Sequence, residues 1–109
     1  MRIVFRTTDH PKQVAKSLKK ITEARGFGRP LGACQDVVAR MFGYHDWHEL
    51  HVVTLDSSDQ SSRDEEVDDR EAEVRRAQQI DVLVKAGLPE TIATELVEEL
   101  KPTGRRRRI

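Results

Sequence analysis

The sequence predicts a mostly α protein with a three-helix N-terminal domain, a candidate short two-stranded β element and a C-terminal αα-hairpin. Apolar residues recur at helical spacing in several stretches, and glycine and proline separate these stretches. Aromatic residues make up only 5% of the 109 residues, so the core is expected to be modest and mainly aliphatic. A large buried enzyme cleft is not predicted from this composition.

The first helix is predicted from about Pro11 to Arg25. Proline fits the first helical position, because its missing N–H group would have no helical partner there. Lysines face away from an apolar stripe at helical spacing, which consists of Val14, Ala15, Leu18 and Ile21. The first helix is therefore amphipathic.

Two further helices are predicted before residue 55. The second runs from about Gly32 to Phe42, and Gly43 suits the left-handed position that follows a helix. Its apolar stripe consists of Cys34, Val37, Val38, Met41 and Phe42. A short third helix begins at Asp46, whose side chain caps it, while Glu49 reaches back to the N–H group of the cap residue.

The candidate β element consists of two short β-branched segments, residues 3–5 and residues 52–55. The two segments are expected to pair either within one chain or across a dimer, and the sequence does not decide between these two arrangements.

The C-terminal hairpin is predicted from two more amphipathic stretches. The first runs from about Arg70 to Ala86 and ends at Gly87; its stripe is Val74, Ala77, Ile80, Leu83 and Val84. The second starts with Pro89 at its first position and stops before Pro102. Two such helices bury too little surface to be stable alone, so the hairpin is expected to dock on the first domain or to self-associate. The expected oligomer or partner face is Ile92, Leu96, Val97 and Leu100.

Charge divides the chain into blocks, although 19 bases balance 19 acids. Residues 1–55 carry a net charge of +4, residues 56–73 carry −7, and residues 74–109 carry +3. We therefore predict a basic helical domain at 1–55, an acidic flexible linker at 56–69, a helical hairpin at 70–101 and an arginine-rich tail at 102–109.

The setting is expected to be cytoplasmic, with no membrane association. No apolar run reaches the roughly 20 residues that span a bilayer, and the first residues are interrupted by charge too early for a signal peptide. Cys34 is the single cysteine, which excludes an intrachain disulfide and a thiolate metal cage. No cofactor is expected.

The stretch from Ala15 to Leu50 resembles a small bacterial helical domain described as glyoxalase-related. The specific part is the octet at residues 43–50, Gly-Tyr-His-Asp-Trp-His-Glu-Leu, supported by Gln35 and by Ala39-Arg40. One departure is at residues 32–34, where Gly-Ala-Cys stands in place of the small hydroxyl residues common in relatives. The resemblance implies a helical fold and a bacterial cytoplasmic setting, and it implies no reaction.

Four residues of this octet are predicted to form a structural clasp: Tyr44, Asp46, Trp47 and Leu50. Trp47 and Leu50 share one helix face at a spacing of three, so they can close over the first two helices. The preferred interpretation is a buried anchor, and the alternative is an exposed aromatic side chain that stacks on a base or fills a pocket of a partner.

No catalytic residue is predicted, and we expect the protein not to be an enzyme. His45, His48 and His51 invite a metal-site interpretation, but three ligands at this spacing do not converge on one side of a helix. Cys34 lies on an apolar stripe and is interpreted as a buried structural thiol. Metal binding is therefore not the preferred interpretation.

The favoured function is that of a small bacterial regulatory protein that contacts nucleic acid. Lysines line one side of the first helix, and two helices joined by a glycine-containing turn suggest a helix-turn-helix. The second helix offers few side chains to read bases, which favours contact with phosphates. The expected contacts are Lys12, Lys16, Lys19, Lys20, Arg25, Arg29, Arg40, Arg105, Arg106, Arg107 and Arg108.

The alternative function is that of a protein-binding adaptor, an inhibitor or a toxin–antitoxin component acting through its C-terminal helices. A homo-oligomer, most simply a dimer, fits this view. The segment at residues 79–83, Gln-Ile-Asp-Val-Leu, also resembles the short peptide with which proteins dock on the bacterial replication sliding clamp. That peptide binds in an extended form, whereas these residues fit a helix.

Overall fold

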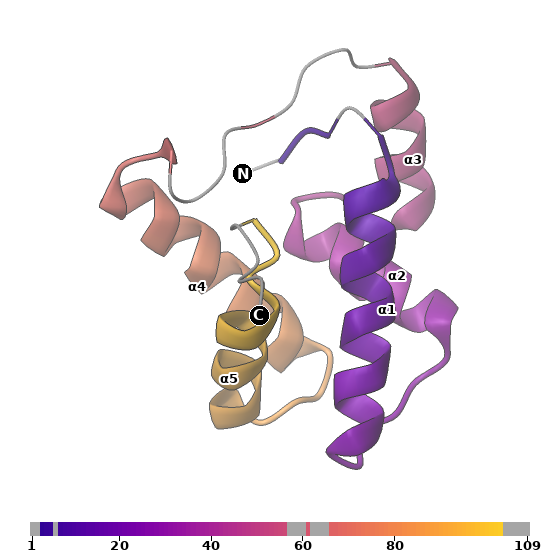
Figure 1. Cartoon of the computed structure of the whole chain (residues 1–109), viewed down its shortest axis with the longest axis vertical. Helices are drawn as coiled ribbons and strands as arrows, with labels where there is room; N and C mark the ends of the chain where they lie inside the picture. The colour runs from indigo at the N-terminus through magenta and orange to yellow at the C-terminus, as the bar shows by residue number, and fades with distance from the viewer. Residues whose placement is uncertain (1–2, 6, 57–60, 62–65, 104–109) are drawn as a thin grey trace, which may run out of the picture.

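The computed structural model describes residues 3–5, 7–56, 61 and 66–103. This part of the chain folds into five helices and contains no strand, so the prediction of a mostly α protein is confirmed. No helix among the described residues is long and apolar enough to cross a membrane. Figure 1 shows the helices, which are α1 (Asp9–Ala24), α2 (Leu31–Met41), α3 (Trp47–Asp56), α4 (Asp69–Lys85) and α5 (Glu90–Leu100).

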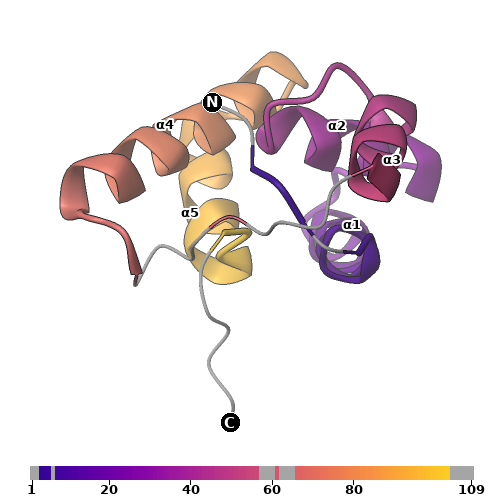
Figure 2. The same cartoon turned by 90° about the horizontal axis from the view of Figure 1, so that it is seen from above.

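Helix α2 occupies a central position, in contact with α1, α3 and α4. Helices α4 and α5 form the predicted hairpin, and α5 also contacts α1. Viewed from above, the hairpin lies on one side of the molecule and α1 and α3 lie on the other (Figure 2). One hydrophobic core joins both sides, since it includes Leu18 of α1, Val38 of α2 and Leu96 of α5. The hairpin therefore docks on the N-terminal helices, which was one of the two expected arrangements.

Helix α1 forms much as its sequence predicts. Its buried side chains are Pro11, Val14, Ala15, Leu18 and Thr22. The hydroxyl group of Thr22 is satisfied inside the helix, because its Oγ1 donates to the carbonyl oxygen of Leu18 at 2.7 Å. The apolar face of α1 thus points into the core and the lysine-bearing face points outward.

Helix α3 includes the residues that the sequence assigned to a second strand. Residues 52–55 continue the helix that begins at Trp47, so the predicted β element is wrong. The physical reason is that the cap at Asp46 nucleates a helix. Leu50 and Thr54 lie four residues apart on one side of this helix, and both are buried. β-branched side chains then extend the helix despite their preference for strands.

Residues 3–5 contact the helices without pairing as a strand. The amide of Ile3 donates to the carbonyl oxygen of Phe42 at 2.8 Å, at the end of α2. The amide of Val4 donates to the Ser61 hydroxyl oxygen at 2.8 Å, and the amide of Ser61 donates back to the carbonyl oxygen of Val4 at the same distance. Phe5 packs edge-on against Phe42, with ring centroids 4.8 Å apart.

Helix α4 faces the core with a different side from the one that its apolar residues predict. Its buried residues are Arg75, Gln79 and Leu83, whereas Val74 and Val84 are exposed. Burial of Gln79 is compensated by a hydrogen bond, because its Nε2 donates to Thr103 Oγ1 at 3.0 Å. The buried side of this helix thus combines Leu83 of the core with the hydrogen-bonded Gln79.

The division of the chain into a basic domain, a linker, a hairpin and a tail stays a prediction. Most of the predicted linker, residues 57–60 and 62–65, lies outside the described residues, and so do residues 104–109 of the tail. The first two residues of the tail, Pro102 and Thr103, are buried. His10 Nε2 of α1 lies 2.5 Å from the carbonyl oxygen of Pro102, so the end of the hairpin contacts the start of α1.

Candidate nucleic-acid interface

The predicted cationic face of α1 is present as a row of three exposed lysines, Lys12, Lys16 and Lys20, which we name the lysine stripe. The three are spaced four residues apart, so they lie one above another along the same side of the helix. Among the described residues, none of them forms an ion pair. By contrast, an acidic side chain lies within 4 Å of each of Lys19, Arg25, Arg75, Arg76 and Lys85.

Lys19 lies beside the lysine stripe and is less exposed. Its ammonium group pairs with Glu23 one helical turn later. A paired ammonium attracts an external anion less strongly than an unpaired one, so Lys19 would contribute less to any polyanion site than its three neighbours.

Arg25 binds within the molecule. Its Nη1 lies 2.7 Å from Glu95 Oε2 and its Nη2 lies 3.8 Å from Glu99 Oε2, both on α5. This predicted contact residue therefore bridges α1 to the hairpin.

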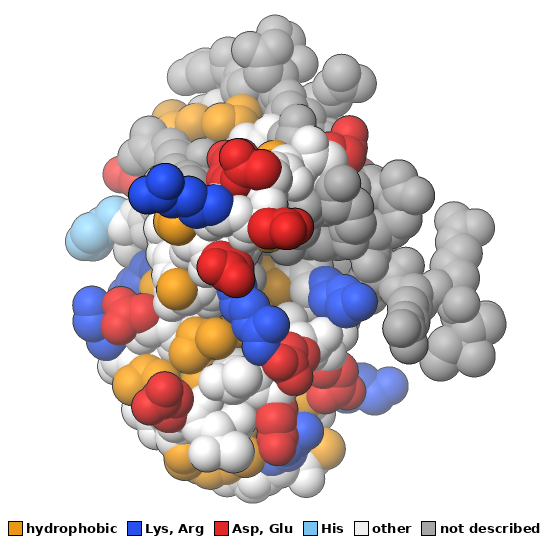
Figure 3. Space-filling view, turned by 90° about the vertical axis from the view of Figure 1, so that its left-hand side faces the viewer, with side chains coloured by type: hydrophobic (Ala, Val, Ile, Leu, Met, Phe, Trp, Pro, Cys, Tyr) orange, Lys and Arg blue, Asp and Glu red, His pale blue; other side chains and the backbone are white. Residues whose placement is uncertain are grey.

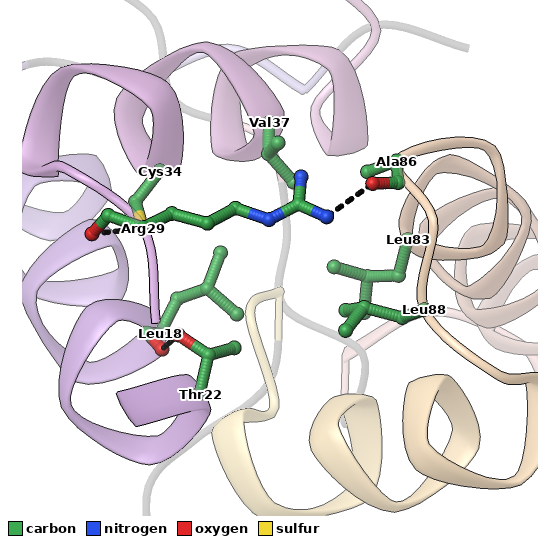
Figure 4. A pocket seen from close by; sticks show the side chains of 8 residues that line it. All are labelled: Leu18, Thr22, Arg29, Cys34, Val37, Leu83, Ala86 and Leu88. Carbon is green, nitrogen blue, oxygen red and sulfur yellow. Dashed lines mark hydrogen bonds between the residues drawn. The ribbon is translucent and has the colours of Figure 1, made fainter. Parts of the chain in front are cut away.

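Arg29 also binds within the molecule. Figure 4 shows its side chain crossing from the start of α2 to the end of α4, where Nη2 donates to the carbonyl oxygen of Ala86. Ala86 is the C-terminal cap residue of α4, whose carbonyl has no partner in its own helix. The arginine thus satisfies a helix end, and its charge suits the negative end of the helix dipole.

The remaining predicted cations divide into two groups. Arg40 is exposed, and its Nε donates to the carbonyl oxygen of His45 at 3.3 Å. Residues 105–108, the arginines of the tail, lie outside the described residues. Of the predicted contacts, the described structure thus gathers Lys12, Lys16 and Lys20 on one exposed face.

Helix α2, the expected recognition helix, buries one side in the fold and exposes the other. It is buried at Cys34, Val37, Val38, Ala39 and Met41 and is in contact with α1, α3 and α4. A recognition helix must instead present side chains to a DNA groove. The exposed side of α2 carries Gly32, Ala33 and Arg40, so it offers few side chains that can read bases.

The predicted clasp is largely buried. Tyr44 is buried and its hydroxyl group donates to the carbonyl oxygen of Ile3 at 2.8 Å, while Leu50 is fully enclosed in the core. Trp47 is only partly buried against that core, so it is neither the fully buried anchor nor the fully exposed aromatic side chain that the sequence offered as alternatives. The clasp therefore holds α3 and the N-terminal segment to α2.

Asp46 caps α3 as predicted, but the side chain of Glu49 bonds a different backbone N–H group from the predicted one. Asp46 Oδ1 accepts from the amide of Glu49 at 2.9 Å, whereas Glu49 Oε1 accepts from the amide of His45. The backbone N–H bond to Asp46 is the main reason why the pKa of this carboxyl lies below its usual range. A second cap was not predicted: Asp36 Oδ1 of α2 accepts from the amide of Trp47 at 3.1 Å.

An open groove lies between α2 and α3 and includes part of the predicted histidine cluster. His48 and His51 both line it, but His45 does not, and its Nδ1 lies 3.2 Å from Asp46 Oδ2. No set of three or more histidine, cysteine or acidic side chains suited to a metal ion occurs in the described ranges. The groove is lined by Gly32, Gln35, Asp36, Trp47, His48 and His51.

Cys34 lies against a small apolar cavity of about 10 Å³, between the start of α2 and the end of α4 (Figure 4). Burial raises the pKa of the Cys34 thiol, and the nearby positive charge of Arg29 offsets only part of this effect. A thiol with a raised pKa is a poor nucleophile at neutral pH. The geometry of Cys34 is thus that of a structural thiol.

The predicted partner face on α5 is part of the protein's own core. Leu96, Val97 and Leu100 are buried, and Ile92 packs against the same core. The expectation that these four residues form a free partner surface is therefore wrong, because docking of the hairpin covers them.

The segment at residues 79–83 is helical, and both of its ends are buried at Gln79 and Leu83. An extended clamp-docking peptide would require the helix to unfold. This alternative does not fit the structure.

Comparison of the chain with protein-family models, curated proteins and solved structures gave no match.

Proposed function

We propose that this chain is a non-enzymatic binding protein that contacts the phosphate backbone of nucleic acid through the lysine stripe of α1. The observation that carries the proposal is the exposure of Lys12, Lys16 and Lys20 on one helix face, without an ion pair among the described residues. Most other cations in the same part of the chain are bound to acidic side chains or to carbonyl oxygens.

The lysine stripe is unfavourable for the isolated protein. Like charges four residues apart on a helix destabilise it by about 0.2–0.5 kcal/mol per pair, and the stripe contains two such pairs. A polyanion removes this repulsion and releases its own counterions when lysines approach its phosphates.

The dimensions of the stripe also suit a duplex. Eight residues of helix separate its first and last lysines, which corresponds to about 12 Å along the axis. Double-stranded DNA carries about seven phosphate charges over that length. The four arginines at residues 105–108 would add positive charge if they reach the same polyanion.

Binding is expected to depend weakly on base sequence. Base readout needs side chains that enter a groove, and α2, the helix expected to supply them, is packed among three others. Phosphate contacts alone position a protein without selecting a sequence.

The alternative function, a protein-binding adaptor, inhibitor or toxin–antitoxin component, would need a surface other than the expected one. The expected surface included Leu96, Val97 and Leu100, which are buried. We therefore prefer nucleic-acid contact.

Fluorescence anisotropy with a labelled DNA duplex tests the proposal. The triple variant Lys12→Gln, Lys16→Gln and Lys20→Gln should weaken binding by about tenfold or more at low salt. Lys16→Gln should weaken it more than the control Lys101→Gln, which makes the same charge change at an exposed residue beyond α5. Equal effects of Lys16→Gln and Lys101→Gln would contradict a site on α1.

A further inference from the structure

The outward face of α4 carries apolar side chains that the fold leaves uncovered. Val74 is 47% exposed and Val84 is 39% exposed, and Ala77 between them is exposed as well. On the opposite side of the same helix, Arg75 and Gln79 are buried. Figure 3 shows the surface on the hairpin side of the molecule, where hydrophobic side chains lie among acidic and basic ones. Two of the three large hydrophobic side chains that are exposed among the described residues therefore lie on this one face.

Two pairs of residues on this face lie symmetrically about Gln79. Val74 lies five positions before Gln79, and Val84 lies five positions after it. Glu73 lies six positions before it and Lys85 six positions after it, so an acid is matched with a base. A contact between identical copies requires such self-complementarity, because each residue must fit its symmetry mate on the same patch.

We propose that this face binds a second copy of the chain, with the two α4 helices antiparallel around a two-fold axis level with Gln79. The axis places Val74 of each copy level with Val84 of the other. It also brings Glu73 of each copy level with Lys85 of the other, so opposite charges flank each valine contact on its two sides. The antiparallel orientation additionally aligns the helix dipoles favourably.

Two more residues make a close approach feasible. Ala77 stands near the centre of the face, where its small side chain permits the 8–10 Å axis separation of packed helices. Asp81, the other central residue, is paired with Lys85 of its own chain at 2.9 Å. Its charge therefore enters the contact partly neutralised. This proposal does not depend on the proposed contact with nucleic acid.

Sedimentation equilibrium of the full chain over a range of concentrations, without nucleic acid, tests the proposal. The wild-type mass should rise with concentration from 12.5 kDa towards twice that value. Val74→Lys and Val84→Lys should each raise the dimer dissociation constant by about tenfold or more, because each buries an unpaired charge in the contact. Both positions are exposed, so the helical circular dichroism signal should persist and report that the variants still fold.

Val52→Lys is the matched control, because Val52 is also an exposed valine on a helix, at 42% exposure on α3. It should leave the dissociation constant unchanged. A monomer at every concentration would overturn the proposal. So would a dimer that survives both substitutions on α4, or one that Val52→Lys dissociates equally.

Discussion

Arg29 shows how a residue with an expected external role can act inside the fold. Basic residues after a lysine-rich helix are typical of nucleic-acid contacts, and the sequence has no feature that links Arg29 to a carbonyl 57 positions away. The structure makes that link at Ala86, the cap residue of α4. The partner comes from the hairpin, so the bond exists only once the tertiary fold has formed.

We predict that Arg29→Ala lowers the free energy of unfolding by about 1–3 kcal/mol, since hydrogen bonds to charged groups contribute this much and the carbonyl loses its partner. Urea denaturation followed by circular dichroism measures the change. Lys12→Ala is the control and should have little effect on stability, because Lys12 is exposed and forms no ion pair among the described residues. Equal stability of Arg29→Ala and the wild type would show that the bond contributes nothing.

Asp46 was predicted correctly, because a cap depends on residues only three positions apart. Its pKa is lowered chiefly by the bond from the Glu49 amide and further by the side chain of His45. A folded-state pKa below the unfolded value stabilises the protein above the unfolded pKa. This stabilisation is lost as the pH falls through the folded pKa.

We therefore predict that the stability advantage of the wild type over Asp46→Asn shrinks as the solution is acidified below the ordinary range of aspartate. Asparagine keeps a capping oxygen but cannot ionise. Denaturant midpoints of both proteins, measured from neutral to acidic pH, give the comparison. A difference that is constant across this range would contradict the role of the charge.

At the scale of the element, the apolar pattern predicted helices well where local signals agree and poorly where tertiary contacts decide. The helical region of α1 and the turn at Gly43 follow from spacing and from backbone preference, and Gly43 does adopt a φ of 92°. The strand predicted at 52–55 was wrong because the helix capped at Asp46 continues through these β-branched residues instead of ending before them. The predicted buried side of α4 was wrong because the burial of Gln79 depends on a hydrogen bond to Thr103, which lies 24 positions away.

Two neighbouring residues on α4 test the observed rotation. Leu83 is fully buried and Val84 is 39% exposed, although the sequence placed both on one apolar stripe. Leu83→Ala should cost about 2–5 kcal/mol of unfolding free energy, and Val84→Ala should cost less than about 0.5 kcal/mol. The measurement belongs at low protein concentration, where self-association does not contribute. Similar costs for both substitutions would contradict the orientation of α4.

At the scale of the whole molecule, the shared core connects the two helical units that charge and composition separate. Arg25 of the first unit binds Glu95 of the hairpin, and Gln78 of the hairpin donates to the carbonyl oxygen of Met41 at 3.2 Å. Composition cannot reveal such contacts, because it records which residues are present in a block and not what they touch.

We predict a single cooperative unfolding transition. Trp47, the only tryptophan, reports on the N-terminal unit through its fluorescence, while circular dichroism reports on all helices. The two signals should give the same denaturant midpoint. Separate midpoints would indicate that the units fold independently, as the division at the linker suggests.

The central claim is that the lysine stripe contacts phosphates, and the salt dependence of DNA binding tests it most directly. Each phosphate contact contributes about −0.9 to the slope of log K against log salt concentration. The slope of the triple variant Lys12→Gln, Lys16→Gln and Lys20→Gln should therefore be shallower than that of the wild type by about 2.7. Identical slopes for the two proteins, or a flat salt response of the wild type, would contradict the claim.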